Sequence, residues 1–178
     1  FGINSLLYQL NPGKLEPLNA NSLIKPQEVQ SEKALESALY LSDHFEVNNS
    51  LSIDYGVRYS IFNYLGPQKV NAYSENLPIA ESNITGNKTY SAGKIIKTYA
   101  APETRLSLRY LFNANLSLKI GYNSQQQYIH SISNTASISP TDIWKLSDPN
   151  IKPQIGEQFS MGIYKNMNSN TIETSFEI

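Results

Sequence analysis

The sequence contains no cysteine and few charged residues. Without cysteine, a disulfide framework, thiol catalysis and a cysteine-based metal site are all excluded. Charged residues make up 16% of the 178 residues, whereas soluble domains usually contain about 25%. The net charge is −1, so we predict no basic surface for binding nucleic acid.

Long apolar runs and catalytic motifs are also missing. No stretch approaches the roughly 20 apolar residues of a membrane helix, and the N-terminus does not resemble a signal peptide. The chain has no nucleophile elbow, no glycine-rich phosphate loop and no His-Glu-x-x-His pair. We therefore predict no enzyme activity, no catalytic residue, no metal site and no cofactor.

Tyrosine is abundant, with 12 residues, and serine and asparagine are plentiful. This composition is typical of β-structure and of a bilayer interface. Residues 51–62 show the clearest pattern, because apolar or aromatic residues alternate strictly with polar residues and glycine up to Ile61. Such alternation predicts a strand with one apolar and one polar face, whereas a helix would spread the charges all round. The apolar positions are Leu51, Ile53, Tyr55, Val57, Tyr59 and Ile61.

The same alternation recurs along the chain. It is clear in residues 105–112, 116–123, 158–164 and 172–178, and weaker in residues 1–10 and 34–45. In residues 34–45 a helix remains the competing interpretation, because good helix formers occur there. We predict about seven strands in all, and therefore an all-β fold.

The connections between these segments alternate between short and long. Three tight turns are rich in asparagine, which tolerates positive φ: residues 48–49, 113–115 and 168–170. The long polar connections are residues 11–32, 64–98 and 131–155. Outer-membrane barrels have short periplasmic turns and long extracellular loops, so we predict an antiparallel up-and-down meander that forms part of a large transmembrane β-barrel.

Several segments resemble a known family. Residues 34–43 lead into the strand at 51–62, and residues 117–123 lead into Gln127-Tyr128-Ile129-His130. Pro102-Glu103-Thr104-Arg105 is similar to a Glu-Pro-Arg element of that family, although here proline precedes the glutamate. On these segments the chain resembles the barrel of TonB-dependent outer-membrane receptors of the Bacteroidetes type.

The resemblance implies a barrel of about 22 strands that is plugged by an N-terminal domain. Residues 1–178 would then be a partial barrel, with the plug and the remaining strands absent, and we interpret both ends as cuts within a larger protein. The implied function is active uptake of a large, scarce nutrient across the bacterial outer membrane, such as a siderophore, a saccharide or a peptide. The implied partners are outer-membrane lipid, the rest of the barrel and plug, TonB through the missing N-terminal part, and a surface lipoprotein.

The alternative interpretation is a secreted β-sandwich that serves as an adhesin or a carbohydrate-binding module. The two interpretations differ in where the apolar faces lie, because a sandwich buries them between two sheets, whereas a membrane barrel turns them toward lipid. Finding these side chains exposed on one sheet would therefore favour the barrel.

Four residues are candidates for ligand binding. Trp144, in the third long connection, could stack on a ligand at the extracellular mouth or pack its loop onto neighbouring residues. Arg58, Arg105 and Arg109 are on polar faces and would point into a barrel lumen. There they could contact an anionic ligand or a plug carboxylate, and a pairing role within the barrel wall is the simpler interpretation.

Overall fold

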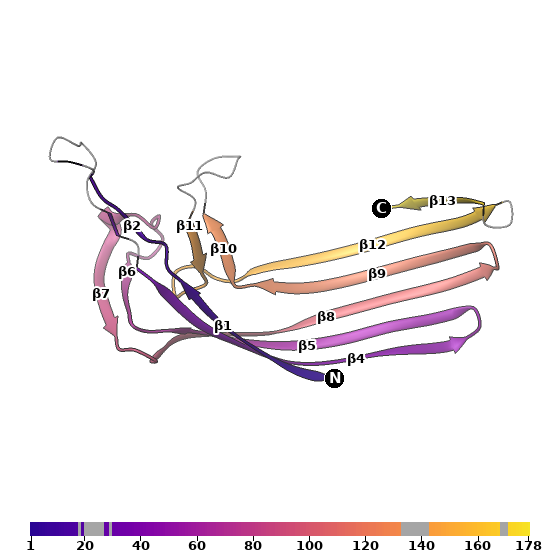
Figure 1. Ribbon diagram of the computed structural model, residues 1–178, viewed down its shortest axis with the longest axis horizontal. Coiled ribbons are helices and arrows are strands. Elements are labelled where there is room, and N and C mark those ends of the chain that lie inside the picture. The colour runs from indigo at the N-terminus through magenta and orange to yellow at the C-terminus, as the bar shows by residue number, and fades with distance from the viewer. Residues whose placement is uncertain (18, 20–26, 29, 133–142, 168–170) are drawn as a thin grey trace.

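The computed structural model describes residues 1–17, 19, 27–28, 30–132, 143–167 and 171–178. Seven strands form one antiparallel sheet in the order β1-β4-β5-β8-β9-β12-β13 (Figure 1). Each strand therefore pairs with the next long strand along the chain, and the predicted meander is confirmed. The strands are β1 (Gly2–Leu10), β4 (Glu32–Asn48), β5 (Leu51–Leu65), β8 (Ile95–Asn113), β9 (Leu116–Gln127), β12 (Gln154–Met167) and β13 (Ile172–Glu177).

The long connections contain short hairpins of their own. These pair β2 (Lys14–Leu15) with β3 (Gln27–Glu28), β6 (Gln68–Tyr73) with β7 (Ile84–Tyr90), and β10 (Ile129–Ile132) with β11 (Ile143–Leu146). One 3-10 helix, η1 (Glu81–Asn83), precedes β7. No helix in the described part of the chain is long and apolar enough to cross a membrane.

The segment at 34–45 is a strand, so the competing helix interpretation is wrong. It lies within β4, which pairs along most of its length with β5, and its first half also pairs with β1. Pairing on both sides satisfies its backbone groups and overrides the local helix propensity. Cross-strand pairing also makes some strands longer than predicted, and β8 begins ten residues before the alternation at Arg105.

Two of the predicted turns are confirmed, and asparagine side chains stabilise both. Asn48 Oδ1 accepts hydrogen bonds from the backbone N–H groups of Ser50 and Leu51, at 2.8 and 3.0 Å. Asn113 Oδ1 accepts one from the N–H group of Asn115, at 2.9 Å. These bonds form local turns that close each hairpin. The third predicted turn lies outside the described residues.

The sheet has one apolar face, which we call the outer face. Register places apolar side chains in rows across the strands. One row contains Phe45, Ile53, Leu108, Ile120 and Met161, and the next contains Leu51, Tyr110, Leu118, Ile163 and Phe176. All of these side chains are exposed or half-buried. The prediction that this face is exposed although apolar is therefore confirmed, and no second sheet covers it in the described part of the chain.

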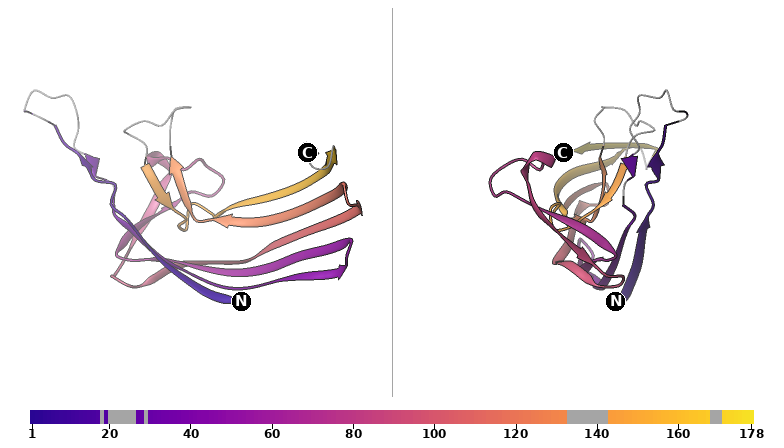
Figure 2. Two further views of the ribbon diagram at one scale, coloured as in Figure 1. Left: turned by 45° about the vertical axis from the view of Figure 1, so that its right-hand side comes forward. Right: turned by 90° about the vertical axis from the view of Figure 1, so that its left-hand side faces the viewer.

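The sheet is curved, with the short turns at one end and the additional hairpins at the other (Figures 1 and 2). Its edges are β1 and β13. The hairpin of β10 and β11, which we call the inner hairpin, lies within the curve of the sheet (Figure 2). It contacts the polar face, so the only hydrophobic core in the described residues is on the side of the sheet that the alternation marks as polar.

Candidate functional site

The inner hairpin is attached to the polar face through aromatic side chains. Tyr128, just before β10, stacks on Phe62 of β5 with ring centroids 4.6 Å apart and planes at 6°. Its hydroxyl group forms a hydrogen bond of 2.7 Å with Ser60 Oγ. Ala34, Tyr64 and Leu146 complete the buried cluster. This packing removes apolar surface from water on both elements and fixes the hairpin over the wall.

Glu32, at the start of β4, links three elements of this site. Its Oε1 accepts hydrogen bonds from Lys145 Nζ at 2.5 Å and from Tyr64 Oη at 3.1 Å. Its Oε2 accepts one from the backbone N–H group of Leu146 at 2.8 Å. The carboxylate is almost fully buried, so these bonds compensate for its lost hydration. They join the wall strands β4 and β5 to the inner hairpin.

Lys145 lies between two acids. Asp148 Oδ2 is 3.0 Å from its Nζ, in addition to the contact with Glu32. Burial lowers the pKa of Lys145, but the hydrogen bonds and negative charges of the two carboxylates outweigh it, so its pKa is raised. Asp148 also accepts hydrogen bonds from the N–H groups of Asn150 and Ile151. Lys145 therefore stays protonated at neutral pH, and the network continues through Asp148 into the loop that leads to β12.

Arg58 forms a second ionic network below the hairpin. Its two terminal nitrogens contact Glu36 of β4 and Glu103 of β8, each at 2.5 Å. Tyr8 of β1 donates a hydrogen bond of 2.7 Å to Glu36. The network crosses four adjacent strands, and the carboxylates are largely buried. Arg58 therefore pairs within the wall, which is the simpler of its two predicted roles.

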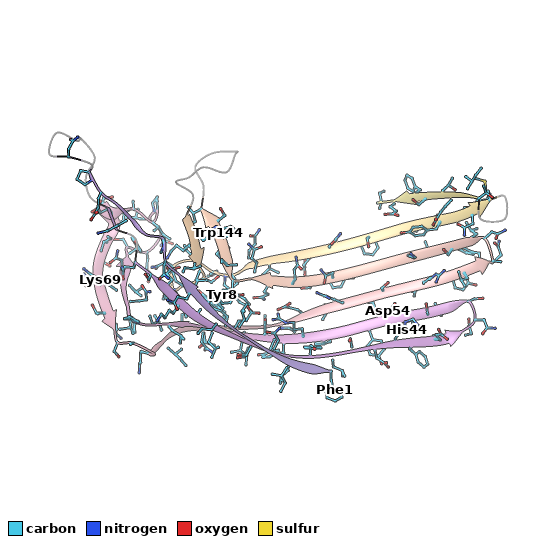
Figure 3. The ribbon with its side chains drawn as sticks, viewed as in Figure 1. Phe1, Tyr8, His44, Asp54, Lys69 and Trp144 are labelled. Carbon is cyan, nitrogen blue, oxygen red and sulfur yellow. The ribbon has the colours of Figure 1, made fainter. Side chains whose placement is uncertain are left out.

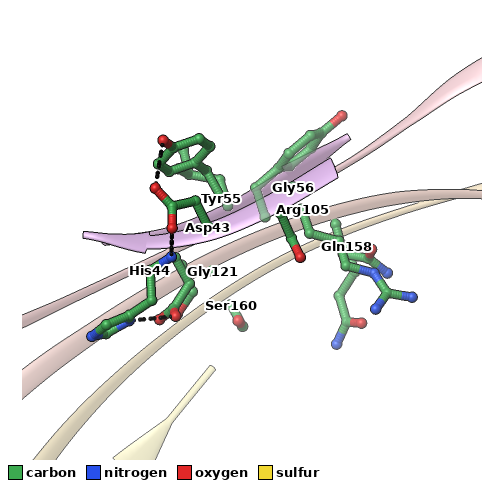
Figure 4. A pocket seen from close by; sticks show the side chains of 14 residues that line it. Asp43, His44, Tyr55, Gly56, Arg105, Gly121, Gln158 and Ser160 are labelled. Carbon is green, nitrogen blue, oxygen red and sulfur yellow. Dashed lines mark hydrogen bonds and ion pairs between the residues drawn. The ribbon is translucent and has the colours of Figure 1, made fainter. Parts of the chain in front are cut away.

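Arg105 and Arg109 differ from Arg58, because neither forms an ion pair with any described residue. Arg105 lines an open groove of about 650 Å³ on the wall, together with Gly56, Gly121 and Gln158 (Figure 4). Arg109 lies nearer the short turns, beside Lys119 in the register. Both guanidinium groups remain available to a partner that enters the curve of the sheet.

Trp144 lies on β11, and its side chain is 56% exposed (Figure 3). Packing of the loop onto neighbouring residues therefore covers less than half of the Trp144 side chain. On the other side of the hairpin, a cavity of about 250 Å³ is lined by residues of three connections, among them Gln68, Asn71, Lys145 and Asn150. Within the described residues, no group of acids and histidines is placed to hold a metal ion.

The sequence analysis missed Glu32, Lys145 and the aromatic residues of the inner hairpin. One signal was present at the end of β5, where Phe62 and Tyr64 occupy the polar side of the alternation. Two aromatic residues at positions that should face water indicate that another element covers them. Nothing comparable identifies Lys145, because its partner Glu32 is 113 residues away.

One curved antiparallel sheet with a polar concave face and an exposed apolar face defines a wall of an outer-membrane β-barrel. The family model described as TonB dependent receptor-like, beta-barrel matches residues 3–176. The chain therefore belongs to the TonB-dependent receptor β-barrel family. No curated protein and no solved structure gives a significant match.

Membership of this family has direct consequences for function. The family consists of outer-membrane receptors that transport ligands, not of enzymes. The outer face of the sheet is then the lipid-facing surface, and the polar face lines the lumen. The β-sandwich interpretation is replaced by the barrel. The Bacteroidetes type stays a prediction, since the match does not address it.

Proposed function

We propose that this chain forms part of the wall of a receptor for active uptake of a large, scarce nutrient. Residues 1–178 would supply seven strands of a larger barrel, whose other strands and plug domain complete the lumen. The plug would occupy the groove beside Arg105, and TonB would act through an N-terminal part. A siderophore, a saccharide and a peptide are the candidate substrate classes, and a surface lipoprotein is a candidate partner.

The docked inner hairpin is the observation that carries this proposal. It projects from the loop end of the wall into the lumen, where the contacts of Glu32 and Phe62 hold it. A hairpin in this position narrows the extracellular entrance. A narrowed entrance suits a receptor that holds one specific ligand and is poorly suited to a general diffusion pore, whose lumen is filled with water.

The cavity beside the hairpin is the proposed point of first ligand contact. Its charged groups, Glu32, Lys145 and Asp148, are already paired with one another. The side chains of Gln68, Asn71 and Asn150 add neutral amides, which both donate and accept hydrogen bonds. This lining suits a polar ligand with many hydroxyl or amide groups. Exposed Trp144 would add a flat stacking surface on the opposite side of the hairpin, at the extracellular mouth.

Uptake by cells that express the receptor containing this chain tests the proposal. Three nutrients are supplied separately: an iron-loaded siderophore, an oligosaccharide and an oligopeptide. We expect uptake of one of them that requires both the receptor and TonB. Accumulation that persists without TonB would contradict active transport.

Variants of Trp144 and Arg105 test whether these residues bind the ligand. We expect Trp144→Ala to weaken ligand binding, while Trp144→Phe retains much of the affinity because a flat ring remains. Arg105→Gln tests the lumen, and we expect it to lower affinity for an anionic ligand or to loosen the plug. Unchanged ligand affinity in both Trp144→Ala and Arg105→Gln would contradict the assignment of these residues to binding.

A further inference from the structure

The outer face of the sheet carries a carboxylate among apolar side chains. Asp43 of β4 lies between Leu41 and Phe45 along the outer face of its strand, and these side chains are 60% and 55% exposed. Its partner in β5 is Tyr55, and Ile53 and Val57 are the partners of its two apolar neighbours. Asp43 is itself exposed. An acid in this position faces lipid.

Hydrogen bonds hold this carboxylate on the outer side. Tyr55 Oη donates to Asp43 Oδ2 at 3.2 Å, and the backbone N–H group of His44 donates to Oδ1 at 3.0 Å. The imidazole of His44 points to the lumen side, where it pairs with Asp54 at 2.7 Å (Figure 4). The nearby histidine is therefore not available to neutralise Asp43.

No cation of the sheet lies near enough to pair with Asp43. On the described outer-face positions of the seven strands, the basic residues are Lys33 and Lys165. Lys33 is at the loop end of β4, and Lys165 is on β12, four strands away. Ionisable side chains within a membrane are nearly always paired or face water. A complementary cation is therefore expected from outside the sheet.

The position of Asp43 along its strand indicates where that cation would be. Asp43 is five residues from Asn48, which closes the short turn. At a rise of about 3.4 Å per residue and a tilt of about 40°, this separation corresponds to roughly 13 Å along the membrane normal. The headgroup layer occupies roughly 5–7 Å on each side of the hydrocarbon. With the turn projecting about 6–8 Å beyond the headgroups into the periplasm, the carboxylate lies at the boundary between headgroups and hydrocarbon on that side.

We propose that Asp43 and Tyr55 form a binding site for the primary ammonium headgroup of a phospholipid in the periplasmic leaflet. The ammonium group supplies the missing positive charge and donates hydrogen bonds to the carboxylate. The phenol of Tyr55 orients the carboxylate, and its ring occupies the interface that tyrosine favours. A quaternary ammonium headgroup cannot donate these bonds, so it binds less well. The site is independent of the transported nutrient.

Lipid retention by the receptor containing this chain tests the site. The receptor is reconstituted in bilayers of equal amounts of phosphatidylethanolamine and phosphatidylcholine and then extracted in mild detergent, and the retained lipids are quantified by mass spectrometry. We expect the wild-type protein to retain more phosphatidylethanolamine than phosphatidylcholine. Asp43→Asn is expected to bring the ratio toward that of the bulk bilayer.

Asp54→Asn is the matched control, because it removes the same charge from the lumen side of the neighbouring strand. We expect this variant to keep the wild-type lipid ratio. Equal retention of the two lipids by the wild-type receptor would overturn the proposal, even if Asp43→Asn does not fold. Retained enrichment in a folded Asp43→Asn receptor would overturn it as well. Neither result bears on nutrient uptake, so the proposed function is tested separately.

Discussion

Phe62 of the barrel wall and Tyr128 of the inner hairpin stack face to face, with ring planes only 6° apart. This contact joins residues 66 positions apart in the sequence and lies on the face that lines the lumen. The barrel wall thus has two kinds of apolar surface: one that faces lipid and one that holds a loop inside the barrel. The second fixes the shape of the entrance.

Removing the Tyr128 hydroxyl should loosen the inner hairpin without releasing it. Tyr128→Phe keeps the stacked ring but loses the hydrogen bond with Ser60, which we expect to cost about 1 kcal/mol of docking free energy. Tyr128→Ala also loses the ring and should cost about 3–5 kcal/mol. Hydrogen exchange of β10 and β11 amides in the bilayer-embedded receptor measures both effects. Equal protection in the two variants would contradict this contact.

Lys145 should contribute to docking through charge as well as through packing. Lys145→Met leaves the buried carboxylate of Glu32 without its cation, and we expect a loss of about 1–3 kcal/mol. Combining it with Glu32→Gln removes the unpaired charge and should recover part of the loss. The same hydrogen-exchange experiment measures the coupling. Additive losses in the double variant would mean that the two side chains do not interact.

Docking should also weaken at high pH. The folded pKa of Lys145 is raised above its ordinary value, so its contribution is fully present below that ordinary value and is lost as pH rises through the folded pKa. We expect limited proteolysis of the inner hairpin to increase on this alkaline side in the wild type. The same protease acting on Lys145→Met provides the control, which should show no corresponding change.

Positions on the two faces of β5 should differ in how much stability a new charge removes. Ile53 lies on the outer face and Ser52 on the lumen face. Ile53→Arg places a charge at the headgroup end of the outer face and should destabilise the barrel by about 0–1 kcal/mol, whereas Ile61→Arg, near the bilayer midplane, should cost about 2–4 kcal/mol. Ser52→Arg should have little effect. Reversible unfolding from vesicles measures all three, and equal effects of Ile61→Arg and Ser52→Arg would place the outer face away from lipid.

The strands and turns were predictable because their signals are local. Alternation with a period of two follows directly from strand geometry, and the turns at Asn48 and Asn113 contain the side chains that close them. Register is a longer-range property, so the pairing of Arg58 with Glu36 and Glu103 was only one of two open roles. The docking of the inner hairpin was only partly predictable: Phe62 and Tyr64 at polar positions indicate a covering element, but Lys145 and Glu32 meet only after the whole sheet has formed.

Alternating exposure along β5 is the most direct consequence of a transmembrane wall, and the absence of cysteine makes it measurable. Single cysteines at positions 51–64 are spin-labelled in the bilayer-embedded receptor containing this chain, and collisions with oxygen and with a water-soluble nickel complex are recorded. We predict oxygen access with little nickel access at odd positions 55–61, no such preference at even positions 54–58, and neither reagent reaching Ser60, Phe62 or Tyr64. Odd positions from 55 to 61 that are open to nickel, or closed to both reagents, would contradict a lipid-facing outer surface.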